Sequence, residues 1–154
     1  HLNRVLTDHA LSASSLKLEL TESAIVDDPH HSVKLMSQIR ELGIGLQIDD
    51  FGTGYSSLSC LHHFPLNGLK IDRQFLTNAA DRRDYVAVIL AIVQLAHNLG
   101  MTVTAEGLES IDQVVMLQAL NCDQGQGYYF ARPMTAEQAG RYLVCPEGRV
   151  ALSA

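Results

Sequence analysis

The sequence predicts an α/β fold, a TIM-barrel-like (modified β/α barrel) domain of which about five of the eight strand-helix units are present. Short apolar strands alternate with helical segments through the 154 residues, which favours parallel strands joined by right-handed crossovers. Each predicted strand has one apolar and one polar face, with its acid or lysine near the carboxyl end, where barrel enzymes keep their chemistry. The alternative, an open doubly wound sheet, usually has a glycine-rich phosphate turn after its first strand, and that turn is missing here.

Alternating apolar and polar residues predict the first two strands, at residues 16–20 and 44–49. The helix between them begins at the Asp-Pro pair at 28–29, where Asp suits the N-cap and Pro the first helical position, and it ends at Gly43. Residues 1–13 have the apolar spacing of a helix tail without a start signal ahead of them.

The second half of the chain repeats the pattern. Ser56 or Ser57 can cap a short helix, and capping-box pairs open the helices at Ser110 and Thr135. The other elements expected there are strands at 68–72, 102–106 and 122–130 and a helix at 82–99 that Gly100 closes.

The predicted helix at 82–99 is apolar nearly all the way round. One face of a barrel would bury only part of this surface, so a second partner surface is expected. We therefore predict a homodimer formed through this helix. Its apolar positions are Tyr85, Val86, Val88, Ile89, Leu90, Ile92, Val93 and Leu95.

Composition excludes several classes of protein. A net charge of -6 argues against binding to nucleic-acid polymers or to anionic membranes. The 3 cysteines are widely spaced and odd in number, which fits cytosolic thiols better than a disulfide framework or a zinc site. No apolar run approaches the ~20 residues of a membrane span, so we expect a cytoplasmic domain whose parent protein could be anchored elsewhere.

The strand at 44–49 ends at two adjacent acids, Asp49 and Asp50, followed by a glycine-punctuated turn. Because side chains alternate along a strand, Gln47 and Asp49 share one face, with Asp50 at its mouth. Neighbouring carboxylates repel each other, and a magnesium or manganese ion would compensate that repulsion. An ordinary turn remains the alternative, because Asp and Gly are common turn residues.

Polar side chains near the ends of several predicted strands would meet on one rim. Its carboxylates would repel strongly without cations. Two divalent ions bridged by Asp49, about 4 Å apart, would form an arrangement that displaces an oxygen at phosphorus. Lys70 would orient the attacking water or neutralise transition-state charge; the alternative is an internal salt bridge to Asp72 or to another carboxylate. The candidates are Glu19, Asp49, Asp50, Lys70, Glu106 and Gln126.

Five motifs occur in a fixed order: Glu-Leu-Thr-Glu at 19–22, Asp-Asp-Phe-Gly-Thr-Gly at 49–54, Lys-Ile-Asp at 70–72, Ala-Glu-Gly-Leu-Glu at 105–109 and Gln-Gly-Tyr at 126–128. Together they resemble the EAL-domain cyclic di-GMP phosphodiesterases over about residues 16–143. The resemblance implies a modified barrel that hydrolyses cyclic di-GMP to linear pGpG in bacterial second-messenger signalling. It also implies two magnesium or manganese ions as cofactors and inhibition by calcium.

Matching motif positions carry the family's roles onto this chain. The resemblance implies that Glu19 and Asp49 bind the first metal, and that Asp49 bridges to a second metal held also by Asp50 and Glu106.

The resemblance also implies supporting roles for other residues. Lys70 matches a lysine that contacts the nucleophilic water, and Gln126 matches a glutamine near the metal-bound solvent. Glu22 and Glu109 match acids that hold the loop at 49–54 and the metal centre, and Thr53 lies in that loop.

The sequence departs from the family pattern at its beginning. It lacks the Glu-Ala-Leu strand, the arginine after it and an asparagine ligand on the second strand. We therefore expect residues 1–154 to be a partial EAL domain without a second domain, catalytically inactive alone. The intact parent would be the enzyme, alongside sensory or cyclase domains. The alternative is an inactive EAL module that acts as a cyclic di-GMP receptor or a protein-interaction domain. A barrel enzyme for another phosphorylated substrate would require the five-motif match to be coincidence.

Overall fold

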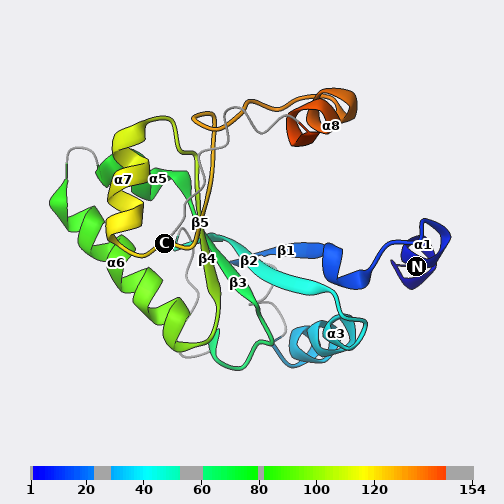
Figure 1. The fold of residues 1–154 in the computed structure, drawn as a ribbon. Helices are drawn as coiled ribbons and strands as arrows, with labels where there is room; N and C mark the ends of the chain where they lie inside the picture. Colours follow the sequence, from blue (N-terminus) through cyan, green and yellow to red (C-terminus); the bar gives the residue numbers. More distant parts are fainter. Residues whose placement is uncertain (1, 23–28, 53–60, 80–81, 145–154) are drawn as a thin grey trace.

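The computed structural model describes residues 2–22, 29–52, 61–79 and 82–144. These residues form an α/β structure around one five-stranded sheet, in which every neighbouring pair of strands is parallel (Figure 1). The strands are β1 (Lys17–Thr21), β2 (Gly45–Phe51), β3 (Gly68–Ile71), β4 (Thr102–Glu106) and β5 (Gln124–Gln126).

The order of the strands distinguishes the two predicted sheet types. It is β1-β2-β3-β4-β5, so each strand pairs with the next along the chain. A doubly wound sheet reverses its strand order at a switch point, whereas a barrel adds strands in one direction. The predicted TIM-barrel-like fold is therefore confirmed.

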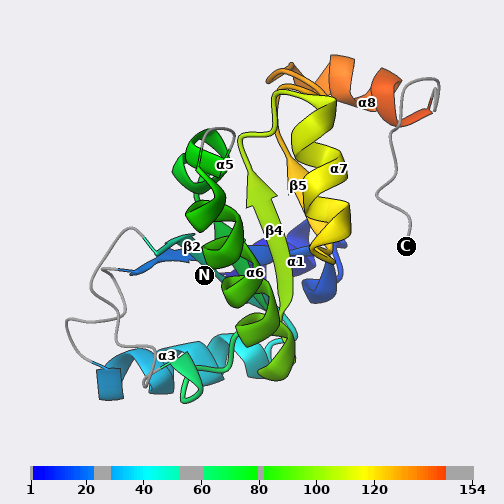
Figure 2. The ribbon, with the colours of Figure 1, turned by 90° about the vertical axis from the view of Figure 1, so that its left-hand side faces the viewer.

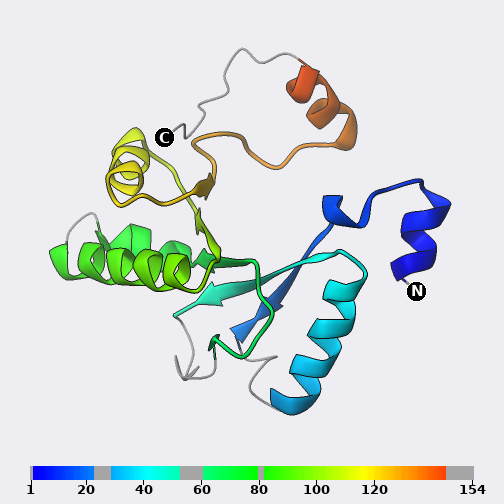
Figure 3. The same ribbon diagram turned by 60° about the horizontal axis from the view of Figure 1, so that its bottom comes forward.

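The helices lie around the strands in separate groups. Figures 1 and 3 show α5, α6 and α7 grouped on one side, with α1 and α8 well apart from them on the other. Figure 2 brings the grouped helices to the viewer. The helical segments are α1 (Leu2–Asp8), the 3-10 turn η1 (Ala13–Ser15), α3 (Pro29–Glu41), α5 (Arg73–Ala79), α6 (Arg83–Asn98), α7 (Ile111–Ala119) and α8 (Ala136–Val144).

The core lies between the apolar face of the sheet and helices α3, α5, α6 and α7. Leu46, Leu69 and Val103 on the central strands are fully buried, as is Ile89 on α6. The opposite face of the strands carries the polar residues, as the alternation predicted. Burial of the apolar face drives the sheet together and leaves the polar face for other work.

Helix α6 confirms the helix predicted at 82–99 and shows which of its apolar residues are covered. Four of its residues are buried, Ile89, Ile92, Val93 and Ala96. The ring of Tyr85 lies 6.1 Å from that of Phe75 on α5, a helix that the sequence analysis did not predict. Val88 and Leu90 are 43% and 37% exposed. The apolar surface open to solvent on α6 is therefore narrower than the predicted one.

The capping boxes and the last strand show where local signals succeed and fail. The Ser110 side chain accepts from the Gln113 amide, and Gln113 accepts from the Ser110 amide, as predicted. Thr135 and Gln138 form the same reciprocal pair. The strand predicted at 122–130 is wrong in length, because only Gln124–Gln126 is extended and the chain turns at once, with the Phe130 amide bonded to the Gly127 carbonyl.

Two predicted features are not tested by the structure. The short helix after Ser56 or Ser57 and the N-cap at Asp28 lie outside the described residues. Within the described segments, every helix is too short or too polar to cross a membrane.

Candidate active site

Strand register brings the predicted polar residues to one end of the sheet. Thr21 of β1 is in register with Asp49 of β2, two residues beyond Glu19. Glu106 at the end of β4 is in register with Gln126 at the end of β5. Because the strands are parallel, their carboxyl ends lie at the same edge, so residues far apart in the sequence share one site.

Lys70 lies at the centre of this site, with a side chain only 5% exposed. Its Nζ lies 2.9 Å from Oε2 of Glu19, 3.0 Å from Oδ1 of Asp49 and 2.5 Å from Oε1 of Glu106. Burial alone lowers the pKa of Lys70, but hydrogen bonds to these carboxylates outweigh burial and raise the pKa above its ordinary value. These carboxylates therefore favour the charged form of Lys70.

The internal salt bridge considered for Lys70 is present, but Asp72 is not its partner. Glu19 is held from a second side as well, since Nε2 of Gln47 donates to its Oε1 at 2.9 Å. Gln47 thus fixes the orientation of a candidate ligand, a role that its place in the strand pattern did not reveal.

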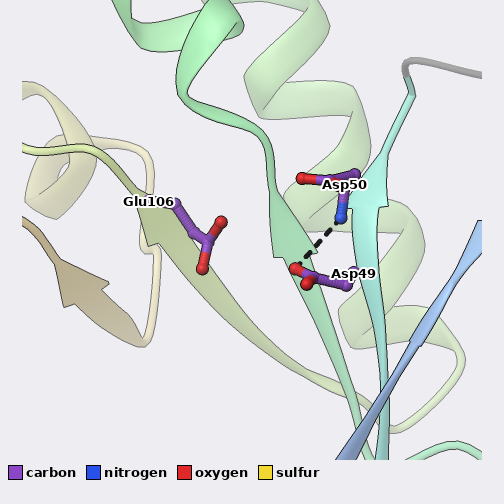
Figure 4. A group of neighbouring side chains, drawn as sticks. All are labelled: Asp49, Asp50 and Glu106. Atoms are coloured by element: carbon purple, nitrogen blue, oxygen red, sulfur yellow. Dashed lines mark hydrogen bonds between the residues drawn. The ribbon is translucent and has the colours of Figure 1, made fainter.

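Asp49, Asp50 and Glu106 form a compact group of acids. Each offers a carboxylate oxygen, and these atoms lie within 4.8 Å of one another (Figure 4). Adjacent residues of a regular strand point to opposite faces, so Asp49 and Asp50 need an irregularity to share a site. Asp50 has a φ of +53°, and the pairing of β2 with β3 shifts register between Ile48 and Phe51.

The carboxyl of Asp50 has a raised pKa. Burial is the largest cause; the charges of Asp49 and Asp72 and a side-chain hydrogen bond with Asp72 add to it, while Lys70 opposes it. Asp72 also accepts from the Gln74 amide at 2.8 Å and so helps to start α5. The sequence pattern suggests Asp72 only as a partner of Lys70, although its place at a strand end signals a side chain that can cap a following helix.

A cleft of about 350 Å³ opens beside the acidic group. The predicted site residues that line it are Asp50, Glu106, Glu109 and Gln126, and Asp72 lies among them. The structure therefore places Glu109 and Gln126 beside the candidate metal ligands.

The turn after β2 is held by Glu22. This side chain is buried, and its Oε2 accepts a hydrogen bond from the Gly52 amide at 3.1 Å. Gly52 has a φ of +93°, and a Cβ there would meet the Phe75 ring at 2.7 Å, so the turn requires glycine. Thr53, the other residue predicted to support this loop, lies outside the described residues.

The donor set fits a divalent cation. Magnesium and manganese prefer hard oxygen ligands, and the three acids supply such atoms from β2 and β4 at close spacing. Like charges at this spacing repel, and Lys70 compensates only part of that repulsion. The three acids therefore form a candidate cation site with the Lys70 ammonium group beside it.

Comparison with known proteins yields a consistent set of relatives. The EAL domain family model matches residues 1–133. MucR of Pseudomonas aeruginosa, a bifunctional diguanylate cyclase/cyclic di-GMP phosphodiesterase, is 42% identical over 137 residues, which are 89% of this chain and 20% of MucR. The cyclic di-GMP phosphodiesterase RocR of the same organism is 41% identical over 134 residues, 87% of this chain and 34% of RocR.

Solved structures agree with the sequence relatives. The MucR phosphodiesterase in complex with c-di-GMP superimposes with a TM-score of 0.85 at 42% identity, covering 89% of this chain and 56% of that one. BlrP1 of Klebsiella pneumoniae, in a manganese/c-di-GMP complex, gives a TM-score of 0.80 at 31% identity, covering 86% and 34%. The chain thus spans about a fifth of MucR and a third of RocR.

Proposed function

The chain belongs to the EAL domain family, and on that premise we propose that it forms part of a domain that hydrolyses cyclic di-GMP to linear pGpG in bacterial signalling. The observation that carries the proposal is the convergence of Asp49, Asp50 and Glu106 on one rim with Lys70 beside them. The names of MucR and RocR support the choice of substrate.

Two divalent cations, magnesium or manganese, are the proposed cofactors. Glu19 and Asp49 would hold the first, and Asp49, Asp50 and Glu106 the second. When bound, such cations polarise phosphoryl oxygens and lower the pKa of an attacking water. The manganese/c-di-GMP complex of BlrP1 supports this choice of metal and ligand.

The chain's own side chains prepare this chemistry. The Lys70 ammonium supplies a fixed positive charge that stabilises the negative charge developing at phosphorus and orients the attacking water. Glu22 anchors the turn that follows the two aspartates through the Gly52 amide, and we propose that Thr53 supports the same loop. Gln126 and Glu109 line the cleft, where Gln126 would position metal-bound solvent and Glu109 would support the metal ligands.

We also propose that the 154-residue chain needs further strands for turnover. Its five strands leave β1 and β5 each paired on one side only within the described sheet, whereas a closed barrel has eight strands. In this proposal residues 1–154 are a partial EAL domain, and the complete protein contains the rest of the barrel with sensory or cyclase domains. We propose that it works in the cytoplasm and dimerises through α6, where Val88 and Leu90 are exposed.

The test is hydrolysis of cyclic di-GMP in the presence of manganese, followed as appearance of pGpG. The short chain is compared with the natural full-length protein, and Asp49→Asn is made in the latter beside the control Asp112→Asn, an exposed acid on α7. We expect only the full-length protein to turn over substrate. Asp49→Asn should then lower turnover by about 100-fold or more while nucleotide binding persists, and Asp112→Asn should change nothing.

Two outcomes would contradict the proposal. If the short chain hydrolyses cyclic di-GMP, the claim that it needs further strands is wrong. If the full-length protein binds the nucleotide but hydrolyses none, the domain is a receptor, and the phosphodiesterase proposal fails.

A further inference from the structure

Arg73 is a charged residue of the cleft that lies outside the five sequence motifs. It begins helix α5 directly after Asp72 and lines the cleft of about 350 Å³ beside the acidic group. The cleft is otherwise lined by the acids Asp50, Asp72, Glu106 and Glu109 and by uncharged residues, so Arg73 is the cation among its lining residues.

The stem of Arg73 is held by the backbone that follows a candidate metal ligand. Gly107, the residue after Glu106, has a φ of +73°, and a Cβ there would lie 2.4 Å from Cβ of Arg73 and 3.6 Å from its Cδ. Gly107 therefore satisfies two demands at once, a left-handed backbone and close contact with Arg73. This contact fixes where the arginine side chain leaves α5.

The head of Arg73 differs from the other cation of the site. Lys70 is buried, and its ammonium group forms ion pairs with three carboxylates. Arg73 is exposed, and within the described segments its guanidinium makes no hydrogen bond or ion pair, although four acids line the same cleft. A guanidinium that is positioned by its stem and open at its head is available to a ligand.

Charge balance indicates the kind of ligand. The substrate of the proposed function carries two phosphodiester charges and must enter a site built from Glu19, Asp49 and the four acids of the cleft. Two divalent cations and Lys70 would supply five positive charges against the six negative charges of these acids, so an incoming dianion would gain little from the group as a whole. A further cation on the wall of the cleft would favour binding of the anion.

Resting on the proposed function, we propose that Arg73 binds a phosphate group of the cyclic dinucleotide and is a substrate-contacting residue. The planar guanidinium matches two phosphate oxygens with two parallel hydrogen bonds, which a lysine ammonium does not reproduce. This contact adds to affinity and orientation, while the acids and Lys70 retain the chemistry.

The test compares Arg73→Gln and Arg73→Lys in the natural full-length protein, with Arg83→Gln as the control. Arg83 is exposed on α6 and does not line the cleft, so the control removes the same charge elsewhere. We expect Arg73→Gln to raise KM for cyclic di-GMP by about 10- to 100-fold with little change in kcat. Arg73→Lys should recover part of the loss through its charge, and Arg83→Gln should match the wild type.

A second ligand separates phosphate recognition from base recognition. Cyclic di-AMP keeps both phosphates but not the guanine edge, and it is used as a competing inhibitor at millimolar concentration. Equal weakening of both nucleotides by Arg73→Gln supports the phosphate contact; weakening of cyclic di-GMP alone assigns Arg73 to the base and overturns it. An unchanged KM for cyclic di-GMP in Arg73→Gln also overturns the proposed phosphate contact. If the wild-type protein hydrolyses no cyclic di-GMP, the proposed function itself is overturned.

Discussion

Gly127 is a position where substitution by alanine should strongly destabilise the fold. It follows β5 directly and crosses the backbone of Leu108 so closely that a Cβ would lie 2.2 Å from both its N and its O. Cβ atoms essentially never approach other atoms within 3.0 Å. Because the obstructing atoms belong to the main chain, no rotamer change can relieve the clash, and the segments after β4 and β5 must move apart.

The cost of Gly127→Ala follows from this clash and from the bonds beside it. Overpacking a rigid site costs about 1–3 kcal/mol, and here the upper end applies because backbone atoms obstruct. The Leu108 amide bonds to the Gln126 carbonyl at 3.1 Å and the Tyr129 amide to the Leu108 carbonyl at 2.9 Å. Lengthening both bonds removes about 1 kcal/mol each, which gives a total loss of about 3–5 kcal/mol. For a chain of this length, the Tm should fall by roughly 6–20 °C.

Urea unfolding followed by circular dichroism measures this loss. Gly140→Ala is the matched control, because Gly140 lies inside α8 and a Cβ there would have nothing within 4 Å. We expect the control to gain up to about 1 kcal/mol, since alanine is the better helix former. If Gly127→Ala unfolds at the same urea concentration as the wild type, the packing of Gly127 against Leu108 is not as described.

Three further predictions concern charge. Asp50→Asn should abolish manganese-dependent hydrolysis yet keep the unfolding midpoint, because asparagine also tolerates the positive φ of this residue; a lost fold would count against that reasoning. Lys70→Met should destabilise the metal-free protein by about 1–3 kcal/mol and make its Tm rise more with added magnesium than the wild-type Tm does, and equal magnesium responses would disprove it. Burial raises the pKa of Asp123, but hydrogen bonds from the Val103 amide and the His97 ring outweigh burial and lower that pKa. The ionised Asp123 carboxylate therefore stabilises the fold fully above about pH 4, and this stabilisation is lost as the pH falls through the lowered pKa. Asp123→Asn should therefore flatten the loss of stability in acid, and parallel acid-unfolding curves would show that Asp123 does not contribute.

The elements that the sequence predicted are those with complete local signals. The strand at 44–49 alternates cleanly, and the structure has β2 there. Ser110 and Gln113 form a capping box with both hydrogen bonds in place, and α7 begins at Ile111. The EAL resemblance drawn from five short motifs is confirmed by a family model that matches residues 1–133.

The elements that the sequence did not predict depend on tertiary context. Helix α5 is a seven-residue helix that follows β3 almost directly, and its stability comes from packing on α6 and β4 rather than from propensity. Ile111 and Val115 are large apolar residues on α7, yet they are 50% and 56% exposed. Periodicity shows that a face is apolar, but only the neighbouring elements determine whether that face is covered.

Asp49 and Asp50 show how the two sequence interpretations, strand end and turn, combine in one structure. A regular strand would send the two carboxylates to opposite faces, and a simple turn would leave them in solvent. Instead both residues belong to β2, and the positive φ of Asp50 with the register shift before Phe51 lets both carboxylates approach Glu106. Asp is one of the few residues that adopts this backbone conformation readily, so the second aspartate supplies a ligand and also the bend that aims it. The sequence identifies Asp50 as a possible ligand, whereas the bend that directs its carboxylate toward Glu106 depends on the pairing of β2 with β3.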